Sequence, residues 1–479
     1  MEVADVVRLA DRAARPAPDA DAMKRVEASW DAARRIAASG RVYGRSTGVG
    51  ANRTEDVPTQ AAAGHGLRLL RSHAGAIGEE LPARQVRAML AVRANQLLAG
   101  GAGLRPTVIT ALCEALERGA HPIVNEFGSV GTGDIAALAQ AGLALAGEHP
   151  WRGSNAPVPQ PLDNNDALAF ISSNALTLGQ AALALHELRG LIGATQVVAA
   201  LSLLAVDGSH EAYAAPVHAA RPHRGSVDVA RRMRELIGAA DRPTPPLGRI
   251  QDPYGFRCLP QIHGPAHDAA DALQDVLTVE INAAAENPLI SPEDLAAYHH
   301  GGFYEAQLAL ALDHFRLAVT QVARLSTSRL STLNEPAYTR LRPFLADHEP
   351  ASSGVMILEY AAGAALGDLR AFSAPASLGH AVLSRGVEEQ ASFASLAARQ
   401  TLRACGAFRL VVGCELVAAV RALRLRDLRP DPGLLVGQAF QLAESVLDGD
   451  LADRPLTGDV TAAAQLLDRF TDIWRGSTS

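Results

Sequence analysis

Two glycine-rich segments near the start of the chain contain side chains that could take part in chemistry. Residues 41–50 (RVYGRSTGVG) place Tyr43 among three glycines, which allow a tight turn that presents the phenol for proton transfer. A tyrosine packed at the edge of a lobe would give the same pattern. Residues 125–134 (NEFGSVGTGD) hold three glycines within six positions, followed by Asp134, which can cap the next helix. A helix N-cap loop, an anion site at a helix N-terminus and a backbone that cyclises all explain this segment.

Two later segments add groups that could bind a charged substrate. Residues 251–261 (QDPYGFRCLPQ) place Tyr254 and Arg257 three positions apart. The arginine could bind a carboxylate through two hydrogen bonds, and the tyrosine could transfer a proton. A structural ion pair between Arg257 and Asp252 is the alternative. The segment GVEEQAS carries an acidic pair that we expect to open a long helix, and a buried Glu388 would need a partner or a substrate cation.

Composition excludes several classes of function. The chain has 479 residues and a formal net charge of -7, which argues against a nucleic-acid partner because such a partner requires a basic face. Lys24 is the only lysine, and its place in a charged N-terminal helix argues against a pyridoxal Schiff base. No Gly-Lys-Ser/Thr motif is present, which excludes a P-loop. The four cysteines are widely spaced, and we expect neither a metal site nor an external cofactor. Without a secretory signal, they predict reduced thiols in a cytoplasmic protein.

The elements that must position these segments are mainly helical. We expect helices over 6–38, 84–99, 106–118, 134–147, 166–206, 266–286, 304–331, 354–371 and 386–427. Residues 148–165 are polar and rich in proline and asparagine, which predicts a loop. The uncharged run 190–206 contains glycines and polar residues, which favours a buried helix over a membrane span. We therefore predict an all-α bundle of long helices (106–479) with a smaller, loop-rich N-terminal lobe (1–105) that carries the Tyr43 loop.

The segments together resemble those of a known family. From about residue 40 to about residue 430, the sequence is similar to the aromatic amino-acid ammonia-lyases, and to their histidine-specific members in particular. The matching motifs, in the family order, are VYGRSTGVG (42–50), SHAGAIG (72–78), QDPYGFRCLPQ (251–261), ENPLI (286–290), GGF (301–303), SGVMILEYAAGAAL (353–366) and GVEEQAS (386–392). One motif alone would be a weak signal, whereas the ordered set is specific.

The resemblance implies an all-α homotetramer of the ammonia-lyase and fumarase-like type, with active sites shared between subunits. It implies that Tyr43 removes the β-proton of a small carboxylate-bearing substrate and that Arg257 binds the carboxylate. The other residues that it places at the site are Gln251 and Tyr254 lining an electrophile, Phe303 near it, and His73 and Glu388 holding an imidazole ring. Asn174 in ISSNALT matches an asparagine that supports the electrophile, although Ser172 aligns equally well without a gap.

The resemblance also implies an electrophile made from the backbone, and here the sequence departs from the family. Family members read Gly-Ser-Val-Gly-Ala-Ser-Gly-Asp and cyclise Ala-Ser-Gly into a methylidene-imidazolone (MIO). Residues 128–134 read Gly-Ser-Val-Gly-Thr-Gly-Asp, one residue shorter, so the corresponding triad is Gly131-Thr132-Gly133. A dehydrated threonine would leave a methyl group on the reactive carbon, which adds bulk and weakens the electrophile.

Three interpretations of function follow. The first is an amino-acid ammonia-lyase or aminomutase whose MIO forms from Gly131-Thr132-Gly133. The second is an enzyme of a biosynthetic pathway that lacks the MIO and acts as an isomerase, cyclase or eliminase on an already activated substrate. Its acid–base and carboxylate-binding groups would be Tyr43, Tyr254, Arg257 and Glu388. The third is a non-catalytic relative that binds a metabolite or a partner, a role with little use for Tyr43 in a glycine loop.

Overall fold

Helices make up most of the structure, a computed structural model that describes residues 1–153, 155–244 and 249–476. The strands in these ranges are short and form antiparallel pairs. The pairs are β1 (Ile77–Glu80) with β3 (Asn125–Phe127), β2 (His121–Pro122) with β4 (Trp151–Arg152), and β5 (Leu289–Ser291) with β6 (Ala296–Tyr298). The prediction of an all-α fold is confirmed.

The chain divides into two compact units, each assembled from three segments. Unit 1 comprises Met1–His186, Leu273–Asp313 and Pro375–Leu402, and unit 2 comprises Glu187–Ala272, His314–Ala374 and Arg403–Ser479. Four of the boundaries fall inside long helices, namely α8 (Ala175–Ala205), α12 (Leu259–Asn282), α13 (Ala306–Leu333) and α16 (Ala394–Leu425). We predicted two lobes divided along the sequence near residue 105. The two compact units are instead each built from segments that lie far apart in the sequence.

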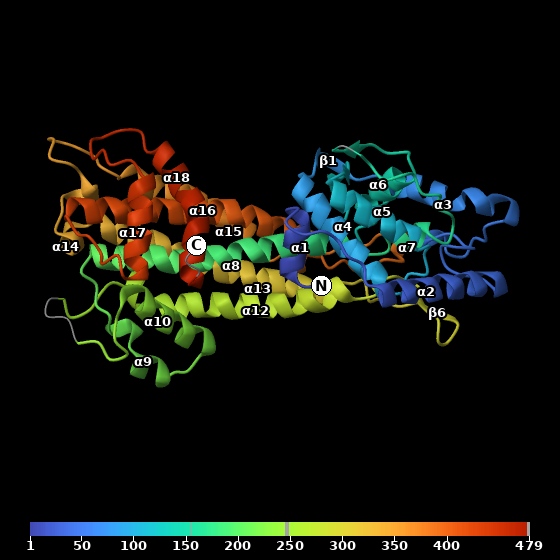
Figure 1. Cartoon of the computed structure of the whole chain (residues 1–479), viewed down its shortest axis with the longest axis horizontal. Coiled ribbons are helices and arrows are strands. Elements are labelled where there is room, and N and C mark those ends of the chain that lie inside the picture. Colours follow the sequence, from blue (N-terminus) through green and yellow to red (C-terminus); the bar gives the residue numbers. More distant parts are fainter. Residues whose placement is uncertain (154, 245–248, 477–479) are drawn as a thin grey trace. The chain divides into compact units, whose positions relative to one another are not determined.

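Unit 1 contains the shorter N-terminal helices and the strand pairs. Its further helices are α1 (Val3–Ala10), α2 (Ala20–Ser39), α3 (Thr59–His73), α4 (Ala83–Leu98), α5 (Thr107–Arg118), α6 (Ile135–Leu145) and α7 (Ala167–Ile171), with 3-10 turns η1 (Gly50–Asn52), η4 (Ala376–Leu378) and η5 (Ser384–Gly386). Helix α4 packs against α1 and α5, and α3 packs against α6 and α7 (Figure 1). Most of the apolar residues of α4 and α6 are buried, so these helices form a packed support for the loops around them.

Unit 2 contains the C-terminal helices and the parts of the long helices assigned to it. Its further elements are η2 (Glu211–Tyr213), α9 (Ala215–Ala219), α10 (Arg224–Ile237), α11 (Tyr254–Arg257), α14 (Pro336–Thr339), η3 (Pro343–Leu345), α15 (Ile357–Phe372), α17 (Leu435–Val446) and α18 (Thr457–Arg475). Helix α10 packs against α9 and α17, and α17 packs against α18, as Figure 1 shows.

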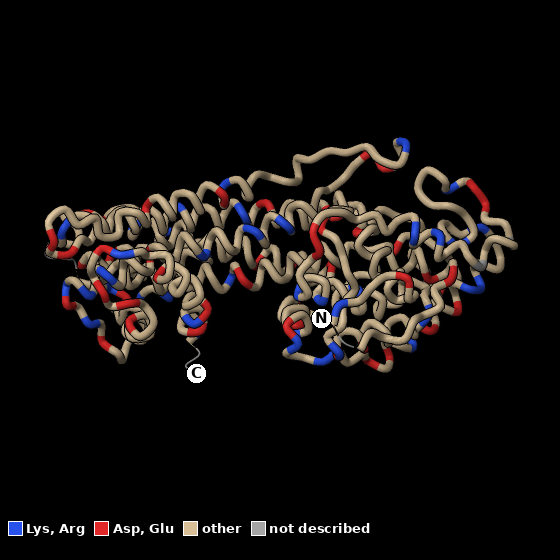
Figure 2. The backbone as a smooth tube through the Cα atoms, turned by 90° about the horizontal axis from the view of Figure 1, so that it is seen from above, with Lys and Arg blue, Asp and Glu red and all other residues tan. Residues whose placement is uncertain are grey.

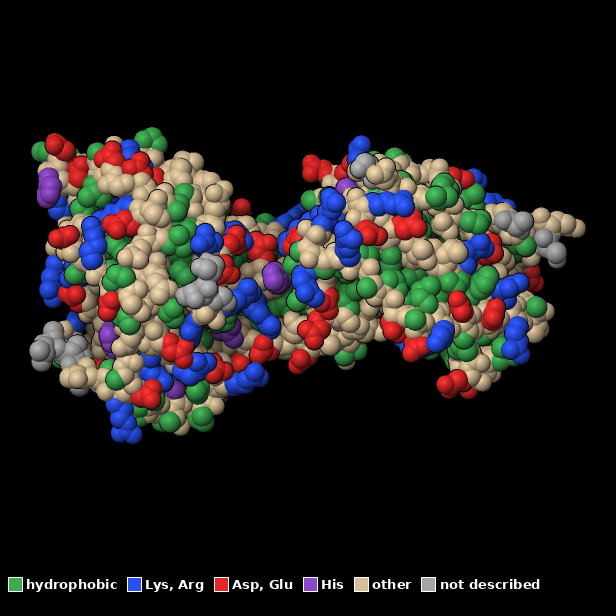
Figure 3. Space-filling view, viewed as in Figure 1, with side chains coloured by type: hydrophobic (Ala, Val, Ile, Leu, Met, Phe, Trp, Pro, Cys, Tyr) green, Lys and Arg blue, Asp and Glu red, His purple; other side chains and the backbone are tan. Residues whose placement is uncertain are grey.

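Charged residues of both signs are interspersed along the backbone in both units (Figure 2). The face drawn in Figure 3 likewise mixes acidic and basic side chains. The stretch Ala167–Ala205 is long and apolar enough to cross a membrane by length and composition. However, 89% of its most apolar window is buried inside the protein, as expected for a core helix.

Several predicted helices are confirmed within a few residues, but four are wrong in extent. The helix predicted over 266–286 begins earlier, at Leu259, and ends at Asn282. The helix predicted over 6–38 is interrupted between α1 and α2, where Pro16 and Pro18 cannot donate helical hydrogen bonds. The helix predicted over 166–206 breaks at Ser172–Asn174, between α7 and α8. The helix predicted from residue 386 begins only at Ala394, so Glu388 lies in a loop and does not open a helix.

Candidate active site

Tyr43 lies in a turn of unit 1 that requires glycine. Gly44 has a φ of +69°, and a Cβ there would lie 2.1 Å from the Leu168 side chain. The turn brings the Tyr43 hydroxyl to the backbone N–H of Gly50, which donates to it at 2.8 Å. Burial raises the pKa of Tyr43; the Gly50 hydrogen bond opposes this rise, and the charge of Glu388 adds to it. The phenol is therefore fixed in place near a carboxylate.

The shortened glycine loop, residues 128–134, is a tight turn held by its own serine. Gly131 and Gly133 have φ values of +88° and +114°, in the region that favours glycine. The Ser129 hydroxyl accepts the N–H of Gly131 at 3.2 Å and donates to the carbonyl oxygen of Gly133 at 3.2 Å. The backbone of the triad is thus folded into one fixed conformation.

Asp134 anchors the end of this loop. It lies at the N-cap position of α6, but its side chain makes no capping hydrogen bond to that helix. Its buried carboxylate instead accepts the N–H and the hydroxyl of Thr177, at 2.7 and 2.9 Å. Burial raises the pKa of Asp134, and the Thr177 hydrogen bonds oppose that rise. The prediction that Asp134 caps α6 is wrong, because the start of α8 takes its side chain.

Asn174 connects the loop to the segment that carries Phe303. Its Oδ1 atom accepts the N–H of Gly133 at 3.1 Å, and its Nδ2 atom donates to the carbonyl oxygen of Phe303 at 2.7 Å. Ser172, the alternative in the sequence alignment, accepts the N–H of Asn287 instead. The break between α7 and α8 is what frees Asn174 to reach the loop.

Glu388 and Ser392 approach the triad from a loop that precedes α16. The Thr132 hydroxyl donates to Glu388 Oε2 at 3.3 Å, and the Ser392 hydroxyl donates to the carbonyl oxygen of Gly131 at 2.8 Å. Glu388 is held in place by backbone hydrogen bonds with Leu383. The site thus combines Tyr43, a carboxylate and the polar backbone of the glycine loop.

The resemblance to the family indicates His73 for the site, and the structure adds His299 beside Tyr43. His73 ends α3, and its Nδ1 atom lies 2.9 Å from the carbonyl oxygen of Leu69 and 3.0 Å from Ser72 Oγ. The ring of His299 meets that of Tyr43 edge to face, with centroids 6.1 Å apart. His299 is therefore an exposed residue whose ring lies beside Tyr43.

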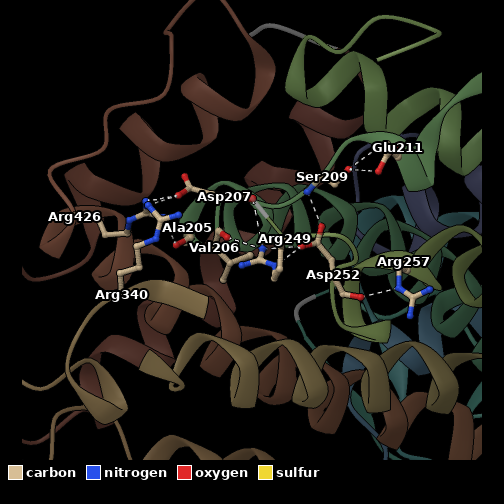
Figure 4. Close-up of polar contacts among 10 residues, drawn as sticks. All are labelled: Ala205, Val206, Asp207, Ser209, Glu211, Arg249, Asp252, Arg257, Arg340 and Arg426. Atoms are coloured by element: carbon tan, nitrogen blue, oxygen red, sulfur yellow. Dashed lines mark hydrogen bonds and ion pairs between the residues drawn. The ribbon is translucent and has the colours of Figure 1, made fainter. Parts of the chain in front are cut away.

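The segment with Tyr254 and Arg257 belongs to unit 2, and Figure 4 shows its polar contacts. Arg257 donates to the backbone oxygen of Asp252 at 2.6 Å, while Arg249 forms the ion pair with the Asp252 carboxylate at 2.6 Å. Within the described ranges, Arg257 has no carboxylate partner, so the alternative of an Arg257–Asp252 ion pair is wrong. The Arg257 guanidinium lies over the Tyr254 ring, 4.7 Å from its centroid. Gln251 and Tyr254 are exposed, with 68% of Tyr254 accessible.

The hydrogen bonds of the triad bear on the ring that the family forms from Ala-Ser-Gly. An imidazolone would form by attack of the Gly133 nitrogen on the carbonyl carbon of Gly131, and in this structure the Gly133 N–H donates to Asn174 Oδ1 at 3.1 Å. The formation of an MIO from Gly131-Thr132-Gly133 stays a prediction.

Two groups at this site were not found by sequence reasoning. Ser392 lies in the GVEEQAS motif but carries no chemical signal of its own. Glu305 follows the GGF motif and is buried at 3% exposure, where its Oε1 atom accepts from Asn174 Nδ2 at 3.1 Å. The only sequence signal for Glu305 is an acidic residue that lies between the GGF motif and an apolar helix.

Some cavities of the protein are lined by residues other than those of this site. One of about 530 Å³ in unit 2 is lined by α8, α10, α12 and α18, and most of its arginines are paired with acidic residues of its own wall, such as Arg189 with Asp271 at 2.7 Å. Among the residues that the structure describes, no group of three or more His, Cys, Asp or Glu side chains could hold a metal ion. The absence of a metal remains a prediction.

Comparisons with known proteins identify the family and the fold of the chain. The sequence profile of the family described as aromatic amino acid lyase matches residues 1–445. The chain is similar to the histidine ammonia-lyase of Geobacillus kaustophilus, with 35% identity over 89% of this chain and 87% of that protein. Two solved structures each superpose with a TM-score of 0.91 at 26% identity. One is histidine ammonia-lyase from Trypanosoma cruzi, covering 100% of this chain and 93% of that one, and the other is the ergothioneine-degrading ergothionase from Treponema denticola, covering 99% and 98%. The chain therefore belongs to the aromatic amino acid lyase family of carbon–nitrogen lyases.

Proposed function

We propose that the protein eliminates an amine from an amino acid with a histidine-type side chain and that Tyr43 removes the β-proton. The observation that carries this proposal is the position of the Tyr43 hydroxyl. It accepts the Gly50 N–H at 2.8 Å and lies near enough to Glu388 for that charge to act on it. A hydrogen bond donated to the phenol oxygen stabilises the phenolate, which is the form that can act as a base.

The nature of the side chain is supported by charge and by the relatives. Glu388 accepts only a weak hydrogen bond from Thr132, so its carboxylate has capacity to bind an imidazole N–H or a cation. The names of the similar proteins indicate histidine and ergothioneine, a histidine derivative, as the molecules on which they act. We assign to His73 the opposite edge of the ring and to Phe303 its face.

We further propose that elimination proceeds without an MIO, on a substrate whose amine is already a good leaving group. Intact mass spectrometry, with a peptide map across residues 125–134, tests this directly. The expected mass is that of the unmodified sequence, because the loop is one residue shorter than in the family and the middle residue of the triad is threonine. A species lighter by two waters, absent from Thr132→Val, would establish the ring and restore the interpretation of an MIO-dependent lyase or aminomutase.

We also propose that the protein is a cytoplasmic homotetramer in which site residues of unit 2 contribute to the active site of another subunit. Large apolar side chains are exposed on α13, α15 and α16 of unit 2, and they are Leu317, Ile357, Tyr360 and Leu410. We propose that other subunits cover them and that Gln251, Tyr254 and Arg257 reach the Tyr43 site of a neighbouring subunit. Their exposure and the lack of a carboxylate partner for Arg257 in the described part of the chain support this assignment.

A subunit-mixing experiment tests the sharing of the site. Tyr43→Phe and Arg257→Ala are each expected to be inactive as purified proteins, because one lacks the base and the other lacks the carboxylate-binding group. When the two are co-expressed, some sites would combine Tyr43 of one chain with Arg257 of another, so activity should return. Co-expression of Tyr43→Phe with a Tyr43→Phe, Arg257→Ala double variant is the control and should stay inactive. If both residues came from one chain, the mixed protein would show no recovery.

A further inference from the structure

Glu305 is a buried acid next to the glycine loop that the proposed reaction does not use. It immediately precedes α13 and is only 3% exposed. Its Oε1 atom accepts from Asn174 Nδ2, whereas its Oε2 atom has no hydrogen-bond partner among residues 1–153, 155–244 and 249–476. An ionised carboxylate with an unsatisfied buried oxygen is costly, so this arrangement favours the protonated acid.

The charges around Glu305 act in the same direction. The titratable groups that influence it are two further acids, Glu280 of α12 and Asp134 at the start of α6. Burial raises the pKa of Glu305 well above its ordinary value, and the two neighbouring carboxyl groups raise it further. The Asn174 hydrogen bond opposes the rise. The dipole at the start of α13 also favours the ionised form, but its effect is small compared with burying a charge beside two others.

Asn174 depends on Glu305 for its orientation. The amide of Asn174 donates to two acceptors, Glu305 Oε1 and the carbonyl oxygen of Phe303, which leaves Oδ1 to accept the Gly133 N–H. If the amide were turned over, its NH2 group would face the Gly133 N–H, and two donors would oppose each other. The acceptor on Glu305 therefore helps to fix the amide in the orientation that holds the loop.

We propose that Glu305 is a positioning residue that stays uncharged in the folded protein and holds Asn174, and through it Gly133, in place. An uncharged Glu305 also spares the site a further negative charge during proton abstraction, when the substrate itself becomes electron-rich. This effect on catalysis rests on the proposed function, whereas the uncharged state of Glu305 does not.

The uncharged state is tested without any activity measurement. Infrared difference spectra of the folded protein at neutral pH should contain a protonated carboxyl band that Glu305→Gln removes and that the exposed control Glu293→Gln leaves unchanged. Above about pH 4.5, the ordinary pKa of a glutamate, an unfolded Glu305 loses its proton while the folded one keeps it. Wild-type stability should therefore fall with rising pH relative to Glu305→Gln, so the Tm difference should grow in favour of the variant. No loss of the band, together with a Tm difference independent of pH, would overturn the proposal.

The positioning role is tested by comparing two substitutions at the same residue. Glu305→Gln keeps an acceptor for Asn174 and should retain kcat close to that of the wild type. Glu305→Leu removes the acceptor and should lower kcat, by up to about 100-fold if the loop moves by an ångström, with little change in KM. If both variants behave alike, Glu305 does not position the loop. If the wild type eliminates no amine at all, the proposed function fails while the infrared and Tm results still decide the state of Glu305.

Discussion

Tyr43→Phe should abolish amine elimination while the protein remains folded. A positioned general base contributes about 10²–10⁴-fold to a proton transfer, and the variant loses the only atom that performs it. The phenyl ring keeps its packing in the turn and its contact with His299. The lost hydroxyl leaves the Gly50 N–H without its acceptor, which costs about 1–3 kcal/mol of the free energy of unfolding. Steady-state kinetics and thermal unfolding separate the two effects.

The pH dependence of kcat/KM in the wild-type enzyme provides a second test of Tyr43 as the base. Because burial raises the pKa of Tyr43, most of the enzyme carries the neutral phenol at neutral pH. The value of kcat/KM should therefore increase with pH on the alkaline side, as the phenolate forms. The control variant Tyr298→Phe removes an exposed hydroxyl of unit 1 and should keep both the rate and the alkaline rise. Full activity in Tyr43→Phe would show that another group removes the proton.

The features that could be predicted from the sequence are those set by neighbours along the chain. The periodic apolar residues of α4, α5 and α6 define helices that the structure confirms within a few residues. The glycines around Tyr43 indicate a tight turn for the same reason. Where tertiary contacts override local pattern, prediction fails, and the contact of Asn174 at the interruption between α7 and α8 is the clearest case. Ser172, Ser173 and Asn174 are residue types that favour a helix start, so they could have indicated the break, but no local pattern indicates that the Asn174 side chain binds Gly133.

The composition of the site is less predictable than the helices because its contacts span long sequence separations. The hydrogen bond from Ser392 to Gly131 joins residues 261 positions apart, and the bond from Gly133 to Asn174 joins residues 41 positions apart. The resemblance to the family pointed to Glu388 as a candidate site residue. Its loop conformation was not predicted, because an acidic pair is also typical of the first turn of a helix. The buried Glu305 was missed because burial depends on the whole fold.

The segment that carries Tyr254 and Arg257 rests on a buried ion pair in unit 2. Arg329 and Glu415 are fully buried and form two parallel hydrogen bonds, at 2.6 and 2.8 Å. The hydroxyls of Ser202 and Ser326 donate to the same carboxylate at 2.7 and 2.6 Å. Arg329 also donates to the carbonyl oxygen of Gly255 at 3.3 Å. The pair thus connects the helical core directly to the backbone between the two candidate site residues.

Glu415→Ala should destabilise the protein more than any other single substitution considered. Removing one partner leaves the Arg329 guanidinium buried and uncompensated, which costs about 3–5 kcal/mol of the free energy of unfolding. Urea unfolding would measure this loss. The control Glu235→Ala removes an exposed carboxylate that pairs with Arg231 and Arg232 of α10, and it should cost no more than about 1 kcal/mol. Because Arg329 also holds Gly255, the surviving folded protein should bind its carboxylate substrate less tightly, with a raised KM. Equal stability of the two variants would mean that Arg329 finds another partner, and an unchanged KM would mean that the position of Arg257 does not depend on this ion pair.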